Sequence, residues 1–436
     1  MDLQTGPEGR PSVRAEFFGR IFGIVVGITI TAALVSPRTI AYTMPILTAL
    51  VFAGLWFEPR IASFRLNVGT VEWTMLVFLA FCAVSMFWAL KASSALQPLI
   101  SALGYFCSSL FLLNAVFAED RTIALRIAEG ICVGLLVGLI YLGFEIATNE
   151  QFKLSLYRGL HIPRSWLRPY RAFTWHNDEL VAIDPTDLTR NIAPITLLLW
   201  SALLALQKIV QPNVARVMSG ILFLFAALII MKSEHETSKV ALLWSTLIFL
   251  VARSGVERSS RILQVTWVVA CLAVIPAALS LQRLNLYQAS WIQPSLRERI
   301  IIWNHTAEES LRAPIIGAGV GTMHELSLRK KPGEEFSAEP SHAHNVYLQT
   351  WRELGAVGAG LLTLIGLATI KRIRRLTESA IPYVQATFAS VMAIIAASYG
   401  MWQPWFIAMF GMCVIVAAVA IRLCQGEGEK TMAQAT

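Results

Sequence analysis

Residues 401–423 read MWQPWFIAMFGMCVIVAAVAIRL and contain no charged side chain before Arg422. A run of about 20 apolar residues is long enough, as an α-helix, to cross the hydrocarbon core of a bilayer. Lipid offers no hydrogen-bond partners to the backbone, so such a run is stable there as a helix that pairs its own peptide groups. This stretch therefore predicts a membrane-spanning helix.

Similar apolar runs recur along nearly the whole chain. Of the 436 residues, only 15% are charged, against about 25% in a typical soluble domain. We therefore predict an all-α integral membrane protein with about twelve spans, forming a single polytopic domain over 1–436. The predicted spans are 20–35, 40–57, 71–90, 96–117, 123–147, 192–206, 214–231, 240–252, 262–281, 346–370, 381–399 and 401–423.

Lysine and arginine in the short loops predict the orientation of the chain. The net charge is +8, but these residues gather in the connections on one side, the pattern that marks the cytoplasmic side, so we exclude nucleic-acid binding. Both termini, the tail 425–436 and the basic cluster 371–375 are then expected in the cytoplasm. The long loops 148–191 and 282–345 are expected outside, the second directly before the last three spans.

The larger outer loop, 282–345, is expected to contain short helices. Its stretch 295–311 reads SLRERIIIWNHTAEESL, and the helical spacing of its apolar residues predicts an amphipathic helix near the membrane surface. Arg299 lies one turn before Trp303 in this helix. Proline and three closely spaced glycines in 314–321 then predict a turn.

His344 and Asn345 lie directly before the tenth predicted span. Nine residues separate them from Gly355, and Gly358 follows three positions later. An imidazole at the outer mouth of a span can act as a base near neutral pH, or it can simply hydrogen-bond the loop. The two glycines are expected to let a neighbouring helix approach closely.

This His-Asn-x9-Gly-x-x-Gly motif resembles the signature of the bacterial O-antigen ligase family. The text HNVYLQTWRELG at 344–355 is similar to the wider superfamily of O-antigen ligases and polymerases, and so is Arg299-x-x-x-Trp303 followed by PIIGAG at 314–319. The specific resemblance covers 295–423, and the rest of the chain agrees in topology only.

The resemblance implies an inverting glycosyltransferase of the bacterial inner membrane. It implies a glycan donor linked to undecaprenyl diphosphate and transfer at the periplasmic face, with membrane lipids as surroundings. The acceptor would be a lipid A core sugar in a ligase, the favoured reading, or another lipid-linked repeat in an O-antigen or exopolysaccharide polymerase. The family's pattern implies His344 as catalytic base, arginines that hold the diphosphate, Arg299 among them by position, and neither metal nor other cofactor.

The sequence departs from the family pattern at one point. The family commonly places a Ser-Arg pair at the start of a span in the middle of the chain, whereas this chain has Ser238 and Lys239. Lysine is a point charge and lacks the fork with which arginine binds phosphate. The second contact to the diphosphate therefore stays open between Lys239, Arg190 and Arg171.

The first outer loop, 148–191, is both basic and acidic. Its arginines and lysine could face a diphosphate or anionic headgroups. Its acidic residues could ligate a divalent cation through oxygen, but they more simply balance the basic ones. The residues concerned in the second reading are His176, Asp178, Glu179, Asp184 and Asp187.

A secondary transporter or lipid flippase is the alternative from another functional class. Many transporters contain internal repeats and polar groups near the midplane of the membrane. This sequence shows no repeat, and its polar residues gather in the two outer loops, which favours chemistry at the surface. A non-catalytic scaffold in a polysaccharide export complex is also compatible with the sequence.

Overall fold

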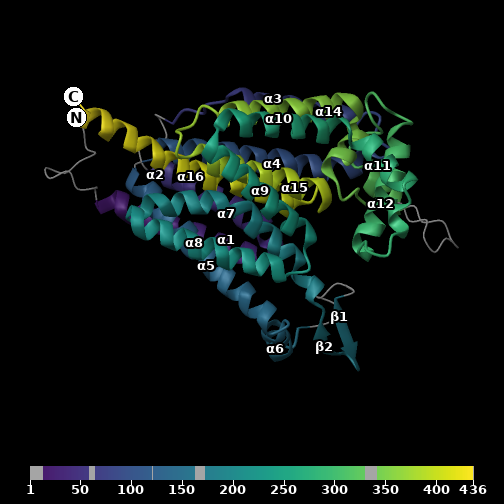
Figure 1. The fold of residues 1–436 in the computed structure, drawn as a ribbon, viewed down its shortest axis with the longest axis horizontal. Helices are drawn as coiled ribbons and strands as arrows, with labels where there is room; N and C mark the ends of the chain where they lie inside the picture. Colours follow the sequence, from purple (N-terminus) through teal and green to yellow (C-terminus); the bar gives the residue numbers. More distant parts are fainter. Residues whose placement is uncertain (1–12, 58–63, 120, 163–171, 329–340, 436) are drawn as a thin grey trace. The chain divides into compact units, whose positions relative to one another are not determined.

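The computed structural model describes residues 13–57, 64–119, 121–162, 172–328 and 341–435, and Figure 1 shows its helices and strands. The chain divides into two compact units, each described separately below. Unit 1 comprises Met1–Phe64, Ala115–Thr246 and Met412–Thr436. Unit 2 comprises Arg65–Asn114 and Leu247–Gly411.

Each unit contains helices from several separate parts of the chain. Unit 1 holds α1 (Val13–Val35), η1 (Pro37–Thr39), α2 (Ile40–Phe57), α5 (Arg121–Ala147), α6 (Gln151–Gly159), β1 (Phe173–His176), β2 (Glu179–Ile183), η3 (Pro185–Leu188), α7 (Thr189–Ile209), α8 (Pro212–Lys232) and most of α9 (Glu236–Ser254) and α16 (Pro404–Ala435). Unit 2 holds α3 (Thr70–Ser85), most of α4 (Ala92–Ala118), α10 (Val256–Leu272), α11 (Val274–Arg283), η4 (Leu286–Gln288), α12 (Pro294–Ser310), α13 (Thr322–Leu328), α14 (Val346–Ile373) and α15 (Ile381–Ala397).

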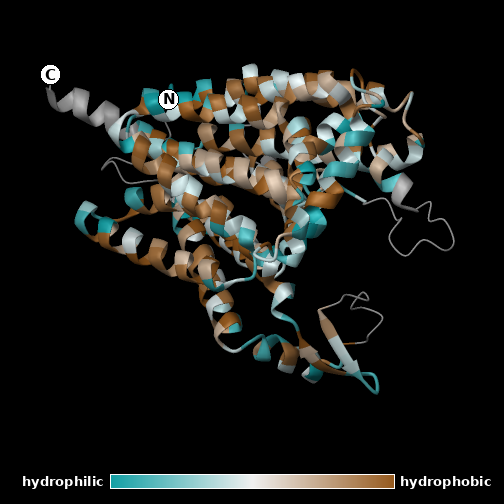
Figure 2. Ribbon diagram, turned by 45° about the vertical axis from the view of Figure 1, so that its right-hand side comes forward, coloured by the Kyte–Doolittle hydropathy of each residue, from teal (hydrophilic) through white to brown (hydrophobic). Residues whose placement is uncertain are grey.

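Eight helices in the described part of the chain are long and apolar enough to cross a membrane, and Figure 2 shows apolar residues along the helices. They are α1, α2, α4, α5, α7, α8, α14 and α16. The predicted multi-pass, mainly α-helical membrane protein is therefore confirmed. The number of twelve spans stays a prediction, because α3 and α15 are apolar but shorter than a full span.

One predicted span is not continuous. The sequence predicted a single helix over 262–281, but α10 and α11 meet there at an angle of 68°. The break falls at Ala273, and Pro276 lies in the first turn of α11. Proline is tolerated in a first turn because the amide it lacks would have no partner inside the helix, so hydropathy alone does not reveal the bend.

In unit 1, α1 and α5 pack backbone against backbone. A methyl group added at Gly130 would lie 1.9 Å from the carbonyl oxygen of Gly23, and one at Gly134 would lie 2.4 Å from that of Gly27. Glycines four residues apart lie on one face of a helix, and small residues there let two helices approach closely. Helix α7 lies in the core of the same unit, since every residue from Asn191 to Leu206 is buried.

Unit 1 also contains a β-hairpin within the first long loop, which the all-α prediction did not include. Strands β1 and β2 pair antiparallel, with His176 opposite Glu179. Asn177 and Asp178 form the turn, and both have positive φ, as the favoured two-residue hairpin turns require. An Asn-Asp pair between FTWH and ELVAI was the available signal.

Candidate active site

The candidate site lies in unit 2, where residues 341–345 lead into α14. Asn345 caps this helix, because its side-chain oxygen accepts a hydrogen bond from the backbone amide of Leu348 at 3.0 Å. Such a cap satisfies one of the amides that a helix leaves without a partner. His344 directly precedes this cap, and its φ of 52° is left-handed, which is uncommon for a residue with a side chain.

The imidazole of His344 is held by the backbone at the end of α15. Its Nδ1 lies 2.7 Å from the carbonyl oxygen of Ser398. A carbonyl oxygen only accepts, so Nδ1 donates the hydrogen bond and the neutral ring has its lone pair on Nε2. This assigns the tautomer in which His344 can take up a proton at Nε2.

A second imidazole packs against the first. The ring centroids of His342 and His344 are 4.1 Å apart, with the planes tilted by 44°. A methyl group at Gly400 would lie 2.8 Å from Cβ of His342. His342 therefore helps to fix the ring of His344, a role that the sequence reasoning did not give it, although the spacing of the two histidines was visible.

Arg299 lies in α12, within the same unit. Partial burial lowers the pKa of this guanidinium, while the neighbouring Tyr399 and Glu298 act in the opposite direction. A partly desolvated cation is stabilised when an anion binds beside it. Arg299 is thus suited to contact a phosphate.

Two connections bring Arg299 and His344 into one region of unit 2. Trp303, one turn after Arg299, donates a hydrogen bond from Nε1 to the carbonyl oxygen of Ala343 at 3.0 Å. Tyr399, which acts on Arg299 electrostatically, directly follows the serine that holds the histidine ring. Arg299 and His344 are therefore linked through Trp303 and through the segment 398–399.

Gly355 interrupts the helical conformation of α14, and the glycine-rich turn at 314–319, which follows α12, packs against this break. It has φ 62° and ψ −159° inside the helix, and a methyl group there would lie 2.5 Å from the carbonyl group of Ile315. The amide of Gly319 donates to the carbonyl oxygen of Glu353 at 2.8 Å, and that of Ala356 donates to Pro314 at 2.8 Å. The segment 314–319 is thereby pinned to the break.

The expectation that a neighbouring helix approaches these glycines is wrong. At Gly355 the close approach is made by the turn that begins at Pro314. At Gly358 the nearest atoms belong to Leu354 of the same helix, with its Cβ 2.2 Å from an added methyl group. The break at Gly355 changes which groups face each glycine, and helical spacing could not reveal it.

Glu353 is a functional candidate that the sequence reasoning missed. It is wholly buried, and it accepts hydrogen bonds from Nε1 of Trp402 at 2.5 Å and from Nε2 of Gln349 at 3.3 Å. The adjacent Arg352 pairs with Glu309 of α12 at 3.4 Å. Both belong to the quoted RELG text, whose glycine alone received a role. They tie the first turns of α14 to α12 and to the segment after α15.

The other proposed phosphate contacts belong to unit 1. Lys239 pairs with Glu236 on its own helix at 2.7 Å, and Ser238 pairs with Nδ1 of the buried His235 at 2.6 Å. Arg190 lies half-buried in the first turn of α7. Arg171 lies outside the described residues.

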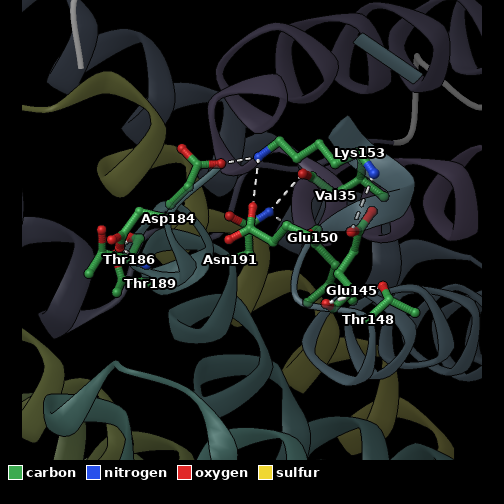
Figure 3. A network of polar contacts seen from close by, with 11 residues as sticks. Val35, Glu145, Thr148, Glu150, Lys153, Asp184, Thr186, Thr189 and Asn191 are labelled. Carbon is green, nitrogen blue, oxygen red and sulfur yellow. Dashed lines mark hydrogen bonds and ion pairs between the residues drawn. The ribbon is translucent and has the colours of Figure 1, made fainter. Parts of the chain in front are cut away.

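Acidic residues of the first long loop, Asp184 and Glu150 among them, take part in a network of polar contacts (Figure 3). Asp184 caps η3 by accepting from the amide of Thr186 at 2.9 Å, and Asp187 pairs with Lys153. Lys153 also approaches the buried Glu150 at 3.8 Å. Across the described ranges, no three His, Cys, Asp or Glu side chains are grouped so that they could hold a metal ion.

Comparison with known proteins identifies the part of the chain that contains this site. The model of the O-antigen ligase family matches residues 195–363, which include Lys239, Arg299 and His344. Three Rickettsia proteins named "Putative polysaccharide ligase" are similar to the chain. The R. felis protein is 23% identical over 355 residues, covering 79% of this chain and 78% of its own length.

The other two relatives match shorter stretches. The R. conorii protein is 32% identical over 132 residues, covering 28% of this chain and 31% of that protein. The R. prowazekii protein is 25% identical over 240 residues, covering 52% of this chain and 57% of that protein. Residues 195–363 are therefore similar to the O-antigen ligase family, the same family that the motif resembles.

Proposed function

We propose that this protein is an inverting membrane glycosyltransferase that transfers a glycan from undecaprenyl diphosphate to a hydroxyl group of the lipid A core. The observation that carries the proposal is the hydrogen bond from Nδ1 of His344 to the carbonyl oxygen of Ser398. It assigns the lone pair of the neutral ring to Nε2, the atom that takes the proton in the proposed reaction. The relatives' name, polysaccharide ligase, favours ligation over polymerisation.

The reaction is a single displacement. Nε2 of His344 takes the proton of the acceptor hydroxyl, whose oxygen bonds to the anomeric carbon of the glycan. The bond from that carbon to the diphosphate oxygen breaks at the same time, and the diphosphate leaves with the electron pair. Attack opposite to the leaving group inverts the anomeric configuration.

Arg299 stabilises the departing charge in this scheme. Charge that develops on the diphosphate is stabilised most by cations already in place, and a guanidinium can bind two phosphate oxygens at once. One of Arg190, Lys239 and Arg171 supplies a second contact. Lys239 must leave Glu236 to do so. In this scheme the base and the anion-binding groups are all side chains, and we expect the reaction to proceed without a metal.

The proposed orientation places this chemistry in the periplasm. His344 and the cluster 371–375 lie at opposite ends of α14, and clustered basic residues favour the cytoplasmic side. The loops 148–191 and 282–345 then face the periplasm, and both termini and the tail 425–436 face the cytoplasm of the bacterial inner membrane.

Substitution of His344 tests the proposal. We expect His344→Asn to lower the rate of transfer by about a hundredfold to ten-thousandfold, the usual contribution of a general base. Asparagine tolerates the left-handed backbone, so the variant should fold and insert. Arg299→Lys should lower the rate at least about tenfold, because the charge stays but the fork does not. The exposed His161→Ala is the control and should match wild type.

The assay uses purified enzyme, an undecaprenyl-diphosphate glycan and lipid A core, with and without EDTA. Full activity of His344→Asn would overturn the assignment of the base. Activity lost in EDTA and restored by a divalent cation would overturn the metal-free mechanism. Lengthening of the lipid-linked glycan in place of transfer to the core would show a polymerase instead of a ligase.

A further inference from the structure

A cavity of about 240 Å³ lies in unit 2 at the opposite end of α14 from His344. The start of α3, at 69–71, forms one part of its wall. The last turns of α14 form the other, with Lys371, Arg372 and Arg375 lining the space. The cavity therefore adjoins the ends of two apolar helices. In the proposed orientation α14 spans the bilayer, which places this end near the lipid headgroups.

The charge of this cavity is positive and incompletely balanced. Arg372 pairs with Glu72. Lys371 and Arg375 are both exposed, and no carboxylate within the described ranges forms an ion pair with either. Three cationic side chains thus line the cavity, one of them paired with Glu72, and no carboxylate is among the described residues that line it.

The start of α3 does not add to this charge. Its carboxylate, Glu72, accepts from the amide of Gly69 at 2.9 Å and offsets the partial positive charge of the first-turn amides. The positive charge of the cavity therefore comes from the basic side chains of α14 and the residues that follow it. Val71 and Ala368 supply apolar wall beside these polar groups, so the cavity combines a cationic and an apolar side.

We propose that this cavity binds the phosphate of an anionic phospholipid headgroup. The two unbalanced cations contact the phosphate, and the apolar wall contacts the glycerol end of the acyl chains. Basic residues near a membrane surface each favour anionic lipid by about tenfold or less. A cavity that holds two of them beside an apolar wall adds selectivity for a single lipid molecule.

The test is lipid-dependent thermal stability of the purified full chain in detergent. Phosphatidylglycerol should raise the melting temperature of wild type, whereas phosphatidylcholine should not. Lys371→Gln with Arg375→Gln should weaken the apparent lipid affinity by about tenfold or more. Arg253→Gln with Arg258→Gln removes two exposed cations from elsewhere in the chain, and this control should respond as wild type does.

A second variant changes the shape of the cavity and leaves its charges intact. Ala368→Leu should fill part of the cavity and should also reduce the rise in melting temperature caused by phosphatidylglycerol. An unchanged response to phosphatidylglycerol in both the double glutamine variant and Ala368→Leu would overturn the proposal. An equal rise with inorganic phosphate alone would overturn the lipid as ligand and identify a free-phosphate site.

Discussion

Glycine brings backbones together in both units, but by opposite means. In unit 1, Gly23 and Gly130 keep helical conformations, and the two straight helices α1 and α5 touch along their length. In unit 2, Gly355 leaves the helical conformation and opens α14, so that the segment 314–319 can pair with the exposed backbone.

The continuous helix pair of unit 1 and the broken helix of unit 2 have different consequences. A continuous helix pair adds packing in a membrane, where apolar side chains gain little from leaving lipid. A broken helix instead creates a short, separately oriented turn region, with Asn345 as its cap and Glu353 as its buried anchor. His344 stands at the start of that region, so we expect changes in unit 1 to alter folding and changes at the break to alter catalysis.

The largest effect is expected from Gly130→Ala. Its methyl group would overlap the carbonyl oxygen of Gly23 at 1.9 Å, which forces the two helices apart and costs about 1–3 kcal/mol or more. We expect little folded protein in membranes, measured by quantitative blotting and detergent melting. Gly220→Ala, which meets no atom within 4 Å, is the matched control and should accumulate normally. Normal accumulation of both would contradict the packing argument.

Gly355→Ala should have a smaller effect on folding and a selective effect on activity. Alanine is strained at φ 62° and would lie 2.5 Å from the carbonyl group of Ile315. The displaced turn should move His344 and lower the transfer rate by about tenfold to a hundredfold, since small misplacements are costly in catalysis. Gly360→Ala on the same helix has open space and should keep full activity. If Gly355→Ala lost as much folded protein in membranes as Gly130→Ala, the expected difference between a folding effect in unit 1 and a catalytic effect in unit 2 would be contradicted.

The smallest effect concerns the buried carboxylate Glu150 in unit 1. Burial raises its pKa to about 7; Lys153 opposes the rise, and Asp187, Glu145 and Asp184 add to it. An acid whose pKa is raised by folding stabilises the fold fully below its unfolded value of 4.5, and this stabilisation is lost as the pH rises toward 7.

Glu150→Gln removes this pH dependence. The variant should melt about 2–4 °C above wild type at pH 8 and close to it at pH 4.5, measured by thermal unfolding in detergent. Glu119→Gln, a change elsewhere in the same unit, controls for loss of one negative charge. An identical difference between variant and wild type at both pH values would show that ionisation of Glu150 is not involved.

The sequence by itself determined the helical membrane class and the family motif, because each depends on residues that are close together in the chain. Apolar runs report burial in lipid residue by residue, and His344, Asn345 and Gly355 lie within twelve positions of one another. The hairpin was also locally encoded, by its Asn-Asp turn, although only the structure brought it out.

Only the tertiary structure decided how the motif works. The tautomer of His344 depends on Ser398, 54 positions away. The function of Gly355 depends on a turn that begins about 40 positions earlier, and the bend of 68° between α10 and α11 is seen only in the structure. Such contacts join segments that are distant in the chain, and no local pattern of hydropathy or spacing specifies which distant backbone group a side chain will meet.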